Sequence, residues 1–441
     1  MNLIYGIKDK PKFAQMLVFA FQQLLAIMAA TIAVPAIVGN GMTASAALFG
    51  AGVGTLVYQL FTKFNSPVFL GSSFAFIGSM LAAFGGAASA QAGFAGIILG
   101  AFLAGLVYVV IALVVKIAGV KWINKLMPPV VIGPTVALIG MSLAGAAIND
   151  VFSYGPQDGN GAFIMTTDLW VSFICAMVTL AVVVVCSTYG KKMISLIPFI
   201  IGVLAGYVVA AIFTVAGVAT VIDFSLFENM KLIALPEFTF LTALKGVKEI
   251  DATYFATVAV AYVPVAFVVF AEHLADHKNL SSIIGKDLTE DPGLHRTLLG
   301  DGVGSMVGAF FGGCPNTTYG ESVGCVAITR NASVVTITTT AIMAILISFF
   351  GPFVAFLDSI PGCVMGGVCI TLYGFIACSG LKMIQKVDLN ENRNLFVVAV
   401  ILITGIGGCT MAIGKVTLTT IACALILGIL VNVLLSFKDK K

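Results

Sequence analysis

Four carboxylates in this sequence lie within or beside long apolar stretches: Glu272, Asp276, Asp301 and Glu321. An ionised side chain inside a bilayer is costly, and such residues mark substrate sites or proton pathways. Glu272 and Asp276 are four residues apart and share one face of a helix. Glu321 is predicted to open a helix, whose free backbone N–H groups favour a ligand's oxygen atoms. Asp301 stands between two glycines, so a role in bracing a close helix contact is equally open.

Three histidines fall in the same region: His273, His277 and His295. The first two have the four-residue spacing of a zinc-binding helix, but the glutamate that follows the first histidine in zinc proteases is absent. An intramembrane metalloenzyme is therefore a remote alternative, and no metal or cofactor is predicted. We expect His277 and His295 to lie at the inner membrane surface, beside Lys278 and Arg296.

The composition decides what kind of molecule holds these side chains. Of the 441 residues, 59% are hydrophobic and only 10% are charged, against roughly 25% charged in a soluble domain. A soluble fold cannot hide that much apolar surface. The net charge of +3 is too small to indicate a nucleic-acid partner. The composition predicts a membrane protein with many spans and excludes a water-soluble enzyme.

The apolar runs predict about fourteen helical spans. Those centred near residues 77 and 323 are short and rich in Gly, Ser and Thr, so they are predicted to be partly unwound. With the N-terminus inside, the outer loops hold only Lys231, Lys245, Lys248 and Lys415 of the 23 basic residues. Such an excess of inner Lys and Arg is typical of membrane proteins, and omitting either unusual span destroys it.

The two unusual spans also indicate an internal repeat. Residues 67–76 and 315–321 share a proline, two hydroxyl residues, an aromatic residue and a small residue, and residues 129–133 pair similarly with 361–366. A polar loop at 217–252 separates the halves. Seven spans per half is an odd number, so the second half is inverted. Paired interrupted helices in inverted repeats indicate a transporter's midplane binding site; close packing by small residues is the alternative.

The sequence resembles the nucleobase/ascorbate transporter family, and within it the bacterial uracil permeases. The resemblance covers nearly the whole chain. Its most specific segments are Gly71-Ser-Ser-Phe-Ala-Phe76, Ala271-Glu-His273, Lys286-Asp287, Asp291-Pro-Gly-Leu-His-Arg296 and Pro315-Asn-Thr-Thr-Tyr-Gly-Glu321.

The resemblance implies an all-α membrane fold of fourteen spans in two inverted seven-span repeats, with short antiparallel strands in spans 3 and 10. It implies a core domain from residues 1–118 and 253–357. It implies a gate domain from residues 119–218 and 358–441, with an extracellular loop at 219–252. Both termini would lie in the cytoplasm, in the inner or sole membrane of a bacterium.

The resemblance also implies proton- or sodium-coupled nucleobase uptake by a homodimer in the lipid bilayer. The implied substrate-binding residues are Glu272, Glu321, Phe74, Gly320, Tyr319, Tyr373 and Ala30. Glu272 and Asp276 would share the coupling proton, and Asp301, Ser73 and Gln23 would support the site from behind.

The chemistry of uracil fits this set of residues. Its flat neutral ring has two N–H donors and two carbonyl acceptors, which carboxylates and backbone N–H groups can satisfy. We therefore predict a uracil–proton importer. Three positions depart from the family pattern, namely Gln23, Asp276 and Ser322, and Asp276 is a residue of purine-transporting members. A xanthine or purine symporter is the nearest alternative, whereas Glu321 argues against both a purine carrier and an anion transporter.

Overall fold

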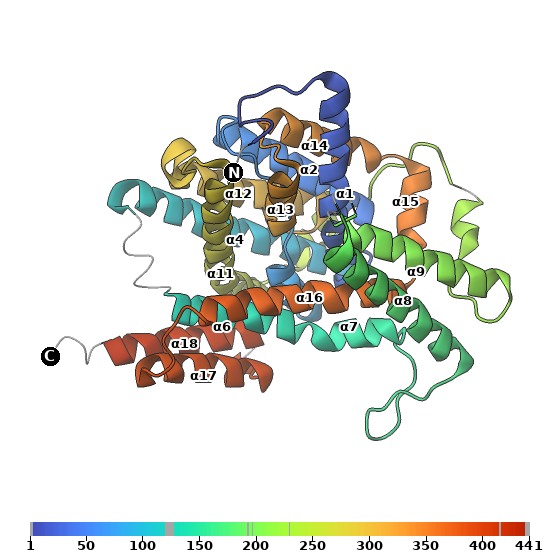
Figure 1. Cartoon of the computed structure of the whole chain (residues 1–441). Coiled ribbons are helices and arrows are strands. Elements are labelled where there is room, and N and C mark those ends of the chain that lie inside the picture. Colours follow the sequence, from blue (N-terminus) through green and yellow to red (C-terminus); the bar gives the residue numbers. More distant parts are fainter. Residues whose placement is uncertain are drawn as a thin grey trace.

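The computed structural model describes residues 3–119, 128–191, 194–195, 197–228, 230–413 and 416–436. The basic residues Lys121, Lys125, Lys192, Lys415, Lys438, Lys440 and Lys441, which contribute to the predicted charge asymmetry, lie outside these ranges. Helices dominate the described chain, and they pack as two groups that are interleaved in sequence (Figure 1).

The first group combines helices from both halves of the chain. Its members are α1 (Phe13–Val38), α2 (Ala44–Phe61), α3 (Ile77–Gly85), α4 (Ala90–Ala118), α11 (Ala252–Ile284), α12 (Leu294–Gly312), α13 (Gly320–Thr329) and α14 (Val334–Ile347). Helices α2 and α12 cross at paired glycines, where a Cβ atom added to Gly50 would lie 2.5 Å from the carbonyl oxygen of Gly308. Small residues permit such close approach between membrane helices, so these glycines bring the two halves together.

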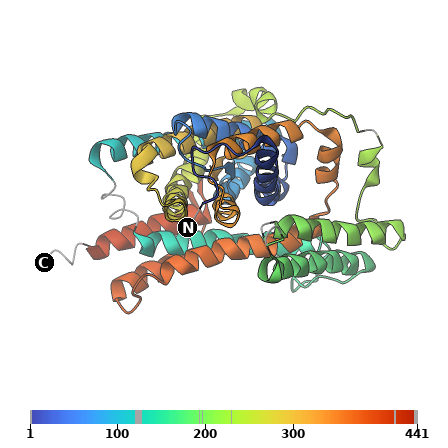
Figure 2. The same cartoon turned by 45° about the horizontal axis from the view of Figure 1, so that its top comes forward.

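The second group forms a separate layer, which Figure 2 shows beneath the first. It contains α6 (Pro129–Ser142), α7 (Ala144–Val151), α8 (Thr167–Tyr189), α9 (Pro198–Val215), α16 (Gly362–Ile384), α17 (Asn392–Ile406) and α18 (Thr420–Ser436). Helices α6 and α16 also meet at glycines, since a Cβ atom on Gly380 would lie 2.1 Å from the amide nitrogen of Ala137. Both groups thus rely on small residues at their internal contacts.

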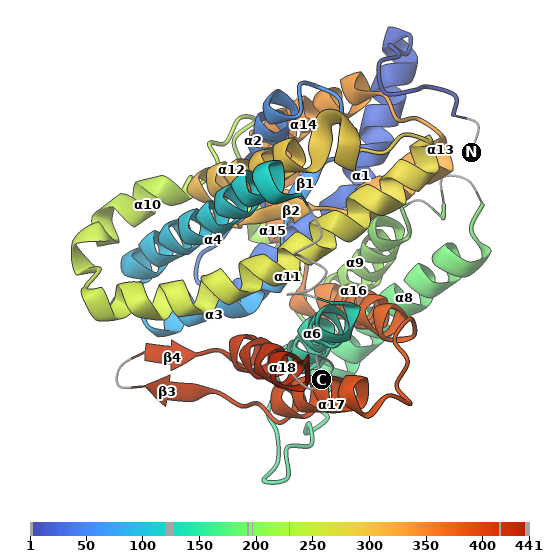
Figure 3. The same cartoon turned by 90° about the vertical axis from the view of Figure 1, so that its left-hand side faces the viewer.

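Two very short strands lie inside the first group. Strand β1 (Leu70–Ser72) pairs antiparallel with β2 (Asn316–Thr318), and all six residues are buried (Figure 3). A short 3-10 helix, η1 (Phe74–Phe76), follows β1 and leads into α3, while α13 follows β2. Each unusual span is therefore part strand and part helix, with a helix start next to the strand pair. This agrees with the expectation of strands in spans 3 and 10.

The remaining elements lie in the connections between these helices. They are η2 (Phe224–Phe227), α10 (Thr239–Gly246), η3 (Val247–Glu249), the turn η4 (Thr289–Gly293), α15 (Gly351–Asp358) and the hairpin of β3 (Met411–Ile413) with β4 (Val416–Leu418). In the described part of the chain, eight helical segments are long and apolar enough to cross a membrane, and four shorter apolar segments accompany them. The protein is a multi-pass membrane protein.

Candidate substrate-binding site

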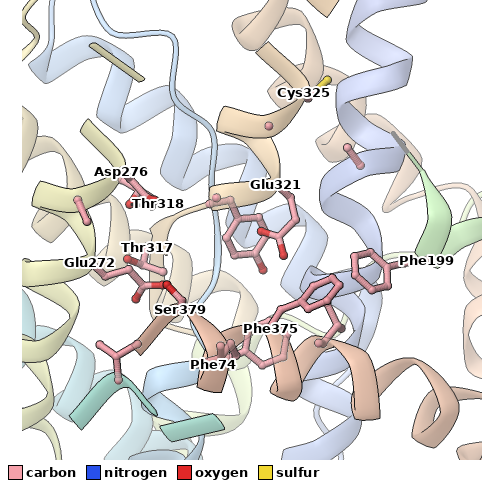
Figure 4. Close-up of a pocket in the computed structure, with 18 of the residues that line it drawn as sticks. Phe74, Phe199, Glu272, Asp276, Thr317, Thr318, Glu321, Cys325, Phe375 and Ser379 are labelled. Carbon is pink, nitrogen blue, oxygen red and sulfur yellow. Dashed lines mark hydrogen bonds between the residues drawn. The ribbon is translucent and has the colours of Figure 1, made fainter. Parts of the chain in front are cut away.

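A cavity of about 440 Å³ lies between the two groups of helices. Its wall on one side consists of α1, α11, β2, α13 and η1, and on the other side of α6, α8, α9 and α16 (Figure 4). Ligand pockets of small molecules are in this size range. The strand pair places its two helix starts at the same cavity, because β1 and β2 run antiparallel beside each other.

Three carboxylates line the cavity. Glu272 and Asp276 reach it from one face of α11, and Glu321 reaches it from the first turn of α13 (Figure 4). The hydroxyl of Thr318 donates a 2.7 Å hydrogen bond to Oδ2 of Asp276, which ties β2 to α11. The sequence predicted Glu272 and Glu321 as substrate-binding residues and Glu272 and Asp276 as proton-coupling residues, and the structure places all three at one cavity.

The cavity offers acceptors without any fixed positive charge. Its lining, which is drawn from the described residues, contains no Lys, Arg or His. A carboxylate ligand or an inorganic anion placed here would face like charges at close range, which is destabilising. A neutral ligand with N–H donors instead finds partners in the side chains of Glu272 and Glu321. The electrostatics thus favour a neutral donor-rich molecule over an anion.

Tyr319 determines where α13 begins. Its hydroxyl donates to the carbonyl oxygen of Ser72 at 2.8 Å, and its aromatic ring lies directly over Gly71. Any side chain at position 71 would collide with that ring, so glycine is required there. The residue after Tyr319 is Gly320, which opens α13 and lies at the cavity wall. The first N–H groups of a helix have no partners within it, and here they adjoin the carboxylate of Glu321.

Aromatic side chains provide flat apolar surfaces in the cavity. Phe74 lies at the start of η1, and Phe199 and Phe375 belong to α9 and α16, with ring centroids 6.1 Å apart. Apolar walls with a few directional polar groups are typical of small-molecule sites. A planar ring is the ligand shape that such walls suit best.

Two residues expected at the site lie behind the cavity wall. Ala30 of α1 is buried in the same apolar cluster as Tyr319. The ring of Tyr373 contacts that of Phe74, with centroids 6.1 Å apart. Neither belongs to the lining residues. Both support aromatic residues that do line the cavity.

The three residues expected to support the site are buried behind it. Gln23 donates a 2.5 Å hydrogen bond from Nε2 to the hydroxyl of Ser322, beside Glu321. The backbone N–H of Ser73 donates to the carbonyl oxygen of Pro315, which extends the strand pair. Asp301 belongs to α12, and its Oδ2 lies 2.7 Å from Nδ1 of His273 on α11.

The histidines differ from the sequence-based expectation. His277 was expected at the inner membrane surface, but it is fully buried. Its Nε2 is hydrogen-bonded to the hydroxyl of Tyr58 at 2.7 Å. Its Nδ1 bonds to the carbonyl oxygen of His273, and the nitrogens of His273 bond to Asp301 and Thr297. All four ring nitrogens therefore have protein partners. Among the described residues, no group of three or more His, Cys, Asp or Glu could hold a metal ion.

Several lining residues were not predicted as site residues from the sequence. Thr317, Thr318, Phe199, Phe375 and Ser379 all face the cavity. The two threonines could have been found from the strand pattern beside Glu321. The residues of α9 and α16 resemble any apolar or small residue of a membrane helix, so only the three-dimensional fold identifies them.

Known proteins confirm the class of molecule. Residues 14–414 match the sequence pattern of a permease family, Xan_ur_permease. The chain belongs to this family. It is 40% identical over 437 residues to the uracil permease of Bacillus caldolyticus, an alignment that covers 98% of this permease and 94% of the relative. It is 38% identical to the uracil permease of Bacillus subtilis, with the same coverage, and 35% identical to that of Escherichia coli K12, covering 96% and 92%.

These relatives make the protein a uracil permease-like member of the nucleobase/ascorbate transporter family, and a transporter rather than an enzyme. Solved structures show the same fold at low sequence identity. The transmembrane domain of the cyanobacterial bicarbonate transporter BicA superposes with a TM-score of 0.60 at 15% identity, covering 97% of this permease and all of that chain. The murine anion transporter Slc26a9 in its inward-facing state superposes with a TM-score of 0.65 at 13% identity, covering 98% and 69%.

Proposed function

We propose that this permease imports uracil by proton symport. The observation that carries this proposal is a 440 Å³ cavity lined by three carboxylates and aromatic rings without a basic side chain. Relatives named uracil permeases match the chain over nearly its full length. Anion transporters share the fold, but three carboxylates at the site disfavour an anionic cargo.

Recognition of uracil would use both kinds of polar group at the site. The carboxylates of Glu272 and Glu321 accept hydrogen bonds from the two N–H groups of the ring. Backbone N–H groups at Phe74 and Gly320, where η1 and α13 begin, donate to the two carbonyl oxygens. A site that bonds every polar edge rejects analogues lacking one edge, because its own buried groups would stay unpaired.

Proton coupling would use the two carboxylates of α11. Glu272 and Asp276 both face the cavity, and Asp276 is bonded to Thr318 of β2. Protonation removes a negative charge from the site, and bound uracil occupies the remaining acceptors. A site that is neutralised by the proton and occupied by uracil crosses the membrane interior at a lower free-energy cost than a charged site. Sodium in place of the proton is the alternative coupling ion.

The arrangement of helices supports alternating access between a core and a gate. Six further helical segments beside the eight long apolar helices bring the number of spans to fourteen: η1 with α3, α12, α13, α14, α17 and α18. The first group of helices corresponds to the proposed core, residues 1–118 and 253–357. The second corresponds to the proposed gate, residues 119–218 and 358–441. Equivalent strand–helix segments in each half support the inverted repeat.

The cavity extends toward one membrane side. Ser187, Ile328 and Met383 lie at the C-terminal ends of α8, α13 and α16, where Lys and Arg are frequent in the sequence. Because basic residues concentrate on the cytoplasmic side, we propose an inward-open conformation, with both termini in the cytoplasm of a bacterial cell and a homodimer as the assembly. At the opposite end, Met28 and Met365 belong to an apolar contact between α1 and α16.

The decisive experiment is uptake of labelled uracil into proteoliposomes under an imposed proton gradient, with xanthine as competitor. We expect accumulation that collapses with a protonophore and ignores xanthine. Glu321→Gln should lose uracil uptake by at least tenfold, because an amide cannot accept with both of its polar groups, while Glu228→Gln in the distant loop should transport normally. Uptake of xanthine instead of uracil, or full activity of Glu321→Gln, would overturn the proposal.

A further inference from the structure

A second, much smaller cavity lies between α4, α11, α12 and β2, and none of its lining residues lines the substrate cavity. Its volume is about 10 Å³, and α4, α12 and β2 provide its polar lining through Tyr108, Asp301, Ser305 and Asn316. Nothing proposed above for transport involves this cavity. Its volume matches the space that one water molecule needs, about 10–15 Å³.

Three polar atoms, one on each of three residues that line this cavity, have no hydrogen-bond partner among the described protein atoms. They are the hydroxyl of Tyr108, Oδ1 of Asp301 and Oδ1 of Asn316. These side chains are 4%, 1% and 2% exposed, so bulk water does not reach them. Buried polar groups in folded proteins are almost always hydrogen-bonded. Three such atoms around one cavity therefore indicate a shared ligand.

The other polar atoms of these residues are already bonded, which fixes what the ligand must offer. The amide Nδ2 of Asn316 donates to the carbonyl oxygen of Gly50 at 3.1 Å, so Oδ1 remains as an acceptor. Oδ1 of Asp301 is also an acceptor, while the hydroxyl of Tyr108 can donate. The ligand thus needs two donors and one acceptor, within hydrogen-bond reach of three elements.

The charge of the neighbouring pair decides between a water molecule and a cation. The hydroxyl of Thr297 donates to the carbonyl oxygen of Leu294, so it accepts a hydrogen bond from Nε2 of His273. One further proton then lies between Nδ1 of His273 and Oδ2 of Asp301, 2.7 Å apart. Whichever of the two atoms holds that proton, the pair has no net charge. A cation in the cavity would leave an uncompensated buried charge, which is costly.

We infer that the cavity between Tyr108, Asp301 and Asn316 binds a single water molecule that bridges α4, α12 and β2. This water donates to Oδ1 of Asp301 and to Oδ1 of Asn316 and accepts from the hydroxyl of Tyr108. It satisfies all three atoms at once. Asn316 immediately precedes Thr317 and Thr318, which line the substrate cavity. The water therefore positions β2 from behind and is a fixed part of the wall that holds the substrate.

The direct test is a crystal structure of the permease at about 2 Å resolution, from crystals soaked in thallium salt. We expect one density peak of a water's strength, within about 2.7–3.2 Å of the three atoms, and no anomalous thallium signal in the cavity. A cavity without density, or an anomalous peak there, would overturn the inference.

A second test uses the sign of a stability change in detergent. Tyr262 is a matched control, because its hydroxyl is also buried and without a partner among the described residues, but it does not line this cavity. Tyr262→Phe should leave Tm unchanged or raise it, because it removes an unpaired polar group. Tyr108→Phe should lower Tm by about 2 °C or more, because it deprives the water of a partner.

Equal shifts in the two variants would show that the Tyr108 hydroxyl has no ligand. The wild-type Tm should also be the same in sodium chloride and in choline chloride at equal ionic strength. A sodium-dependent rise in Tm that Tyr108→Phe abolishes would assign the cavity to a cation by binding linkage, and the water assignment would be wrong.

Discussion

Replacing Gly71 with alanine tests how β1 positions the substrate site. A Cβ atom at this position would lie 2.3 Å from Cε2 and 2.4 Å from Cζ of Tyr319. An ordinary carbon–carbon contact is about 3.5–4.0 Å, so the ring would have to move by more than about 1 Å. Tyr319 is 3% exposed and its hydroxyl is bonded to Ser72, so a displaced ring must strain that hydrogen bond or move into the substrate cavity that Tyr319 lines.

The magnitude follows from the cost of overpacking. Forcing a methyl group into a packed interior destabilises by about 1–3 kcal/mol. Gly320 and Glu321 directly follow Tyr319 in the sequence, so displacement of the ring moves them. If this movement removes about half of a 3 kcal/mol cost from the free energy of uracil binding, the affinity for uracil falls roughly tenfold. We expect a tenfold rise in KM for uracil and a lowered Tm, while the protein still inserts in the membrane.

The assay is initial-rate uptake of labelled uracil in proteoliposomes, together with thermal unfolding in detergent. Gly78→Ala is the matched control, because the nearest atom to a Cβ there is Cδ1 of Ile421 at 3.9 Å. This control should keep its uracil KM and its Tm. A Gly71→Ala permease with the control's KM and Tm would refute the claim that the Tyr319 ring positions α13.

Three further substitutions address other contacts. Thr318→Val removes the hydroxyl that donates to the carboxylate of Asp276 at 2.7 Å. Because hydrogen bonds to charged groups contribute about 1.5–3 kcal/mol, concentrative uracil uptake should fall about tenfold or more. Thr318→Ser keeps the hydroxyl and should retain uptake. Tyr58→Phe leaves Nε2 of His277 without its 2.7 Å partner and should lower Tm by several degrees with an unchanged uracil KM; a changed KM at constant Tm would contradict this purely structural role. The hydrogen bond to Lys286 holds the pKa of Asp291 below its usual value. The pair therefore stabilises the fold at any pH above the usual carboxyl pKa, and this stabilisation is lost as the pH falls through the lowered pKa of Asp291. Lys286→Ala should therefore transport normally at pH 7, and its Tm should converge with that of the wild type as the pH falls below the lowered pKa of Asp291. Divergence of the two Tm values on acidification would show that the sign is wrong.

The sequence predicts the charged residues of the site better than the apolar residues that line it. Glu272, Asp276 and Glu321 are recognisable because charged residues are rare in apolar spans, and the structure places all three at one cavity. Phe199 and Phe375 are equally close to the ligand space, yet the chain contains 33 phenylalanines. An apolar side chain in a membrane helix can face lipid, a neighbouring helix or a cavity, and its residue type does not distinguish these environments.

The same limit explains where individual expectations differ from the structure. Tyr373 was expected at the cavity, but its ring packs against that of Phe74, while Leu372 and Phe375 of the same helix line the cavity. His277 was expected at the surface because Lys278 follows it, but Tyr58, which is 219 residues away in the sequence, binds it in the interior. Long-range contacts of this kind depend on how the halves of the chain meet.

The β1–β2 pair implies an order in which the working protein is made. Each strand has three residues, and the two partners are about 245 residues apart in the chain. An isolated two-stranded pair is at best marginally stable in water, and an unpaired strand in lipid would expose unsatisfied backbone groups. During synthesis, the segment that contains β1 must therefore remain incompletely folded in the membrane until the segment that contains β2 emerges from the ribosome and enters beside it. Any quality-control factor that surveys nascent membrane proteins would encounter an exposed polar segment at residues 70–72 for this whole interval.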